Sequence, residues 1–102
     1  MHLIHLLLPL YDNQQQPLPK TLFTEVRDEL MAQFGGLTVH TRAPVSGLWK
    51  EENSHAVRDE LIIYEVMAPD IDRDWWQRYR ASLETRFRQE QVLIRAHLIE
   101  ML

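Results

Sequence analysis

The 102-residue chain is predicted to form an α+β sandwich, in which two helices cover one face of a four-stranded antiparallel sheet. Three observations support this prediction. Segments that alternate like strands flank segments with the 3.6-residue period of helices, in the order βαββαβ. The two halves of the chain repeat the same apolar spacing from helix into strand. The composition, 45% hydrophobic and 25% charged, is that of an ordinary globular protein.

The first half of the chain predicts a strand, a loop, a helix and a second strand. Residues 2–11 are rich in Leu and Ile and read as a mostly buried strand. Helical periodicity covers residues 19–34, where Pro19 suits the first turn and Gly35 the end. Four apolar residues form its stripe, spaced by three, four and four: Phe23, Val26, Leu30 and Phe34.

A long hairpin is predicted next. Residues 37–42 alternate as a strand, which Pro44 and Gly47 interrupt as at an edge or a bulge. Residues 50–54 form a polar tip, and the returning strand covers residues 59–66. Trp49 on the outgoing arm either anchors a subunit contact or folds back onto its own sheet.

The second half repeats this order. Asp72 is the expected N-cap of a helix over residues 72–89, and the last strand covers residues 91–102. The helix stripe again steps by three, four and four: Trp76, Tyr79, Leu83 and Phe87. Trp75 lies beside this stripe and is expected to pack against the preceding loop, with capping of the hairpin or contact with a partner as the alternatives. The arginines of this helix are expected to pair with acidic neighbours at i,i+4, as in Asp74–Arg78 and Glu84–Arg88.

The repeat supports a single ferredoxin-like domain over residues 1–102. The apolar residues that lead from helix to strand have the same spacing, four residues and then five, in both halves of the chain. They are Leu30, Phe34 and Val39 in the first half and Leu83, Phe87 and Val92 in the second. Two strand–helix–strand units with right-handed crossovers give the sheet order 4-1-3-2, with both helices on one face.

Strand parity then assigns side chains to the two faces of the sheet, because successive residues point to opposite sides. The face under the helices is expected to hold Ile4, Leu6, Leu8, Val39, Ile62, Tyr64, Val66, Val92, Ile94, Ala96 and Leu98. The helix-free face is expected to hold Leu3, His5, Leu7, Thr38, His40, Arg42, Leu61, Ile63, Glu65, Leu93, Arg95 and His97.

Five residues of the helix-free face are candidates for a site: His5, His40, Glu65, Arg95 and His97. Histidine, glutamate and arginine in a half-apolar cleft are the groups that acid–base catalysis uses. The aliphatic residues around them form a larger apolar patch than monomers usually expose, which predicts a homodimer or higher oligomer. Three functions stay open: an oligomer with a small-molecule pocket on this face, a small cofactor-free enzyme, and a protein interaction module.

Composition excludes several other classes. The chain has no cysteine, so it has no disulfide, thiol nucleophile or cysteine-based metal site. Its net charge of -4 argues against nucleic-acid binding. No apolar run reaches the roughly 20 residues that span a bilayer, and the start of the chain reads as a strand and not as a signal peptide. We therefore expect a cytoplasmic protein without a bound cofactor, metal site or membrane contact.

Three short motifs carry a resemblance. F-G-G-L-T (residues 34–38), G-L-W (residues 47–49) and F-x-Q-E-x-V (residues 87–92) resemble those of an uncharacterised group of small bacterial proteins. In topology the chain is also similar to the dimeric α+β barrel superfamily, which includes small monooxygenases and lactone isomerases. This resemblance implies a dimer, but no motif of the superfamily identifies a catalytic residue here.

Overall fold

The computed structural model describes the backbone of residues 1–50 and 56–102 and the side chains of residues 1–40 and 60–102. Its elements are β1 (His2–Pro9), α1 (Lys20–Phe34), β2 (Thr38–Lys50), β3 (Ala56–Ala68), α2 (Arg73–Arg86) and β4 (Leu93–Leu98). The strands form one antiparallel sheet in the order β2-β3-β1-β4. This is the predicted order read in reverse, so the predicted α+β fold and strand order are confirmed.

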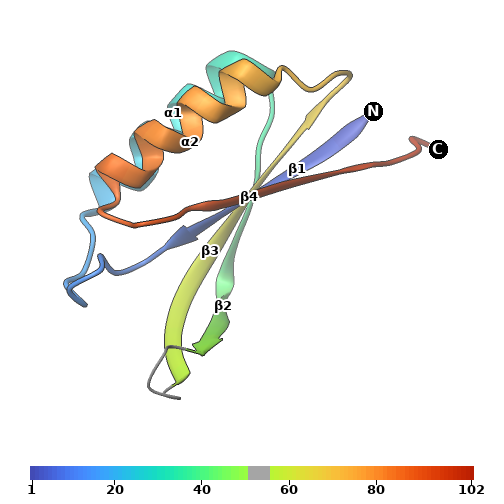
Figure 1. Ribbon diagram of the computed structural model, residues 1–102. Coiled ribbons are helices and arrows are strands. Elements are labelled where there is room, and N and C mark those ends of the chain that lie inside the picture. The colour runs from blue at the N-terminus through green and yellow to red at the C-terminus, as the bar shows by residue number, and fades with distance from the viewer. Residues whose placement is uncertain (51–55) are drawn as a thin grey trace.

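Both helices lie on one side of the sheet, as Figure 1 shows. The core between the two layers joins Ile4, Leu6 and Leu8 of β1 to the buried residues of α1 and α2. Those helix residues are Val26 and Leu30 of α1 and Trp76 and Leu83 of α2. Even positions of β1 therefore face the helices, as strand parity predicts.

Helix ends follow local signals in the sequence. Gly35 ends α1 in the left-handed conformation, with φ 77°, and donates its N–H to the Met31 carbonyl. Asp72 caps α2 by accepting a hydrogen bond from the Trp75 N–H at 3.1 Å. α2 ends at Arg86, before the predicted residue 89, because Arg88 adopts a positive φ of 51°. The Glu84 carboxylate then accepts the Val92 N–H at 2.9 Å, which ties the helix end to the start of the last strand.

Four aromatic side chains join the two helices. Trp75 stacks on Tyr79, with ring centroids 4.8 Å apart, and meets Phe34 edge to face at 5.5 Å. Trp76 stacks on Phe34 at 5.3 Å. The position of Trp75 beside the apolar stripe is therefore explained by packing between α1 and α2.

The strands differ from the prediction mainly at their ends. β1 ends at Pro9, and Tyr11 pairs with Pro17 across the following loop. β4 is an edge strand whose end runs beyond the helices (Figure 1). Ala96 and Leu98 pair with Ile4 and His2 of β1, so they point to the helix side of the sheet as predicted. Both are nevertheless exposed, Leu98 by 74%. Leu61, predicted on the helix-free face, is buried but lies outside the main core cluster.

The long hairpin contains an irregularity where Pro44 predicts one. The pairing of β2 with β3 shifts register between His40 and Val45, whereas Gly47 pairs regularly with Asp59. The side chains of Arg42 and Trp49 and most of the predicted polar tip lie outside the described residues. In the described part of the chain, neither helix combines the length and apolar character that crossing a membrane requires.

Candidate functional site

The centre of the candidate site is a histidine–glutamate pair on the helix-free face. His5 of β1 lies directly opposite Glu65 of β3 in the antiparallel register. The His5 Nε2 is 2.8 Å from Glu65 Oε1, and the two side chains are 17% and 23% exposed. The pair is thus a short, half-buried hydrogen bond between neighbouring strands.

Two more histidines meet this pair from the outer strands. His40 of β2 brings its Nε2 to 3.7 Å from Glu65 Oε1, and its side chain is 51% exposed. The ring of His97 on β4 lies edge to face against that of His5, with centroids 5.7 Å apart. Side chains from all four strands therefore meet around one carboxylate and one imidazole.

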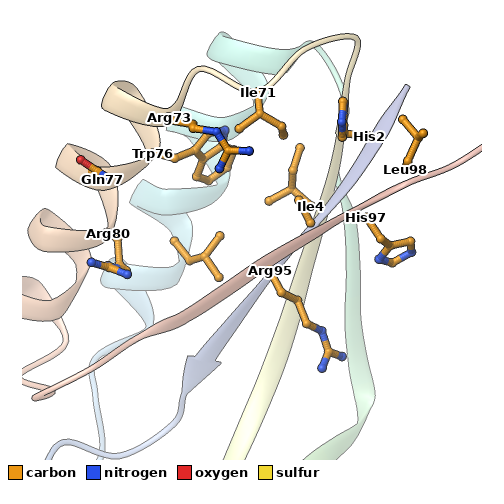
Figure 2. A pocket seen from close by; sticks show the side chains of 12 residues that line it. His2, Ile4, Ile71, Arg73, Trp76, Gln77, Arg80, Arg95, His97 and Leu98 are labelled. Atoms are coloured by element: carbon orange, nitrogen blue, oxygen red, sulfur yellow. The ribbon is translucent and has the colours of Figure 1, made fainter.

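Arg95 is the most peripheral of the five predicted site residues. It lies opposite His5 in the β1–β4 register and is exposed. Figure 2 shows the side chains of Arg95 and His97 pointing away from α2. Arg95 takes part in none of the ion pairs found among the described side chains.

Aliphatic side chains surround the polar cluster. Leu3 and Leu7 flank His5 on β1, and Ile63 neighbours Glu65 on β3; all three are partly buried. Met67 and Leu93 on the same face are 47% and 39% exposed. The cluster therefore lies in a largely apolar surface, where hydrogen bonds and charges are stronger than in water.

One polar atom of this cluster is unsatisfied. His5 Nδ1 is buried and has no hydrogen-bond partner among the described side chains and backbone. A buried polar atom without a partner costs about 1–3 kcal/mol. When Nε2–H donates to Glu65, Nδ1 carries the lone pair, so the pair fixes both the tautomer and the orientation of the ring. Such an oriented imidazole can accept or pass on a proton once a movement of the ring exposes Nδ1.

A second polar site lies on the other side of the sheet, and sequence reasoning missed it. A groove of about 490 Å³ runs between α2 and β4, and Arg73 and Arg80 border it. The expected pairs Asp74–Arg78 and Glu84–Arg88 are absent from the ion pairs of the described residues, and Glu84 instead approaches Arg80 at 4.0 Å. The sequence did contain a signal for this groove, because four of its lining residues have the i, i+3, i+4, i+7 spacing that places them on one face of α2. They are Arg73, Trp76, Gln77 and Arg80.

The loop after β1 holds a carboxylate with a different environment. Asp12 is 4% exposed, and its Oδ1 accepts the N–H groups of Gln14 and Gln16 at 2.8 and 2.9 Å. The hydrogen bond from Gln16 lowers the pKa of Asp12 against the opposing effect of burial, and Gln14 and the nearby Arg88 lower it further. These contacts stabilise the turn within the loop that the sequence predicts between the first strand and the first helix.

Within the described residues, no group of three or more histidine, aspartate or glutamate side chains could hold a metal ion. The chain matches no protein-family model, no curated protein and no solved structure. The resemblance in its short motifs and the similarity in topology to the dimeric α+β barrels stay predictions. Any function must therefore be argued from the geometry of the helix-free face and of the groove.

Proposed function

We propose that this protein forms a homodimer through its helix-free face and binds a small organic molecule in the space that the two copies enclose. The observation that carries the proposal is the His5–Glu65 hydrogen bond of 2.8 Å within an apolar face. Its Nδ1 has no partner in the described part of the chain, and a buried polar atom of this kind calls for an explanation such as a bound ligand.

The aliphatic residues of this face support a second copy as its cover. Leu3, Leu7 and Ile63 are only partly buried, and Met67 and Leu93 are exposed. Contiguous apolar patches of several hundred Å² are uncommon on monomers and frequent at protein interfaces. A twofold axis over the sheet would set the same residues of the two copies against each other.

The polar cluster supports a ligand within that interface. Glu65 is shared by His5 and His40, and the carboxylate remains 23% exposed. A ligand with an apolar body and one hydroxyl or amine group would donate to the carboxylate and place its body against Leu7 and Ile63. Few polar groups in an apolar enclosure are typical of small-molecule sites.

Light scattering coupled to size exclusion tests the dimer. We expect a dimer for the wild type and for Met31→Glu, which adds a charge at an exposed methionine of α1. We expect a folded monomer for Leu7→Glu, with circular dichroism checking the fold, because the new carboxylate would be buried in the interface. A wild type that stays monomeric at millimolar concentration would contradict the proposal.

Native mass spectrometry tests the ligand. We expect a small-molecule adduct on the purified dimer, or on the dimer after incubation with small hydroxy and amino compounds. Glu65→Gln should weaken the adduct by about tenfold, since it removes a charged acceptor worth about 1.5–3 kcal/mol. A dimer that binds none of these compounds would leave the face as a subunit contact alone.

The oriented imidazole favours a second candidate function, proton transfer without a cofactor. His5 would act as the base, Glu65 would orient it, and His40, His97 and Arg95 would stabilise charge on the substrate. Exchange of carbon-bound hydrogen for deuterium in small carbonyl compounds, followed by NMR, tests this role. We expect His5→Phe to abolish any catalysed exchange and Arg95→Gln to lower it; exchange at the wild-type rate in His5→Phe would exclude His5 as the base.

A further inference from the structure

We propose that the groove between α2 and β4 binds a small organic carboxylate with an apolar body. This groove lies on the helix-covered side of the sheet, whereas the proposed ligand site lies on the helix-free face. Arg95 and His97 of the edge strand β4 border both. Its volume of about 490 Å³ falls within the range of small-molecule sites. Figure 2 shows Arg73, Trp76, Gln77 and Arg80 on α2 and, near Trp76, Ile4 of β1.

The groove has an apolar floor. Ile4 and Trp76 are 1% and 9% exposed, and Ile94 of β4 is partly buried against the same core. This floor forms because side chains alternate along a strand, so that Ile4 of β1 and Ile94 of β4 both point toward the helices. There they lie beside Trp76 of α2. An apolar ligand body would therefore lie on a surface that is already packed and ordered.

The rim of the groove is cationic. Arg73 and Arg80 lie two turns apart on α2, with the Gln77 amide between them, and none of the lining residues is acidic. Arg73 is in none of the ion pairs of the described residues, and the contact of Arg80 with Glu84 is long, at 4.0 Å, and half-exposed. Both guanidinium groups are therefore available to a ligand.

The positive charge of the rim favours a ligand that carries a carboxylate. The chain as a whole carries a net charge of -4, so two weakly paired arginines over an apolar floor are a local exception. A guanidinium binds a carboxylate through two parallel hydrogen bonds, and such charge-assisted bonds are about twice as strong as neutral ones. An alkyl or aromatic carboxylate satisfies both the rim and the floor, whereas an alcohol or an amine of the same shape satisfies only the floor.

Titration of the ¹⁵N-labelled full chain with octanoate, octanol and octylamine tests the site. We expect octanoate to shift the amide resonances of Ile94 and Ala96 and the indole resonance of Trp76, with saturation. Octanol should bind at least tenfold more weakly and octylamine more weakly still. The double variant Arg73→Gln/Arg80→Gln should weaken octanoate binding by about tenfold or more, since it removes both charged donors to the carboxylate.

Arg78→Gln provides the matched control, because Arg78 lies on the same helix but does not line the groove. It should leave octanoate binding unchanged. Four results would overturn the proposal: no saturable binding up to millimolar octanoate, equal binding of octanol, an equal effect of Arg78→Gln, or shifts confined to residues near His5 and Glu65. The last result would assign the ligand to the helix-free face instead.

Discussion

The two faces of the sheet are built from the same strands and yet differ in how completely their groups are satisfied. On the helix-covered face, Leu6 and Leu8 are fully buried among the residues of α1 and α2. On the helix-free face, Leu7 is only partly buried, and the neighbouring His5 leaves a buried nitrogen without a partner in the described structure. The helix-covered face explains why the chain folds. The helix-free face, whose groups are less completely buried and hydrogen-bonded, is the better place to look for function.

The polar groups of the molecule repeat this contrast. Asp12 is buried and accepts two backbone N–H groups, so its carboxylate is satisfied by the turn that it forms. Glu65 depends on the side chains of His5 and His40, which come from other strands. A carboxylate satisfied by its own loop serves structure, whereas one shared by histidines from two strands can change partners.

Adjacent leucines of β1 give the largest expected difference between the two faces. We expect Leu6→Ala to lower the free energy of unfolding by about 2–5 kcal/mol, because it opens a cavity in the core. Leu7→Ala should cost about 1 kcal/mol, since its side chain is only partly buried in one copy. Urea unfolding measures both values.

The variants Leu6→Ala and Leu7→Ala also test the proposed dimer. The cost of Leu7→Ala should grow with protein concentration if a second copy covers this face, whereas the cost of Leu6→Ala should not. Equal costs for the two variants in the monomer would contradict the contrast between the faces.

A smaller effect is expected at the His5–Glu65 pair. Glu65→Leu should lower the free energy of unfolding by about 1–3 kcal/mol, because it leaves the Nε2 of His5 without its acceptor. Adding His5→Leu should restore stability to the wild-type value or above it, since apolar residues replace both partners. A double-mutant cycle measures this coupling. Additive losses in the double variant would indicate that the two side chains are not coupled and that each stabilises the fold on its own, which would weaken the functional interpretation of the pair.

The smallest effect is expected at Asp12, and it depends on pH. Hydrogen bonding lowers the pKa of Asp12 below its ordinary value of about 3.9, so its ionised form favours the folded state. That contribution is complete above about pH 4 and is lost as the pH falls through the folded-state pKa. Thermal unfolding from pH 7 to pH 2 should therefore show a smaller acid-induced loss for Asp12→Asn than for the wild type. The change Asp70→Asn at an exposed aspartate is the control, and equal acid profiles of all three proteins would contradict the expected role of Asp12.

Much of the fold could be predicted because it depends on local periodicity. The stripes Phe23–Val26–Leu30 and Trp76–Tyr79–Leu83 predict both helices, and the Gly35 and Asp72 signals act where they were expected. Strand parity correctly set His5 beside Glu65, because one register fixes the face of every residue in a paired strand. The exposure of Leu98 could not be predicted, since it depends on how far the helices extend over an edge strand.

By itself, the sequence determined the order of the elements, the faces of the strands and the composition of the helix-free face, because these follow from local periods of two and 3.6 residues. Only the tertiary structure decided the 2.8 Å contact of His5 with Glu65, the burial of His5 Nδ1 away from any partner among the described residues, and the arginine-lined groove between α2 and β4. Each of these depends on the distance between elements that are far apart in the chain. Such distances are set by side-chain packing across the whole domain, which no local pattern encodes.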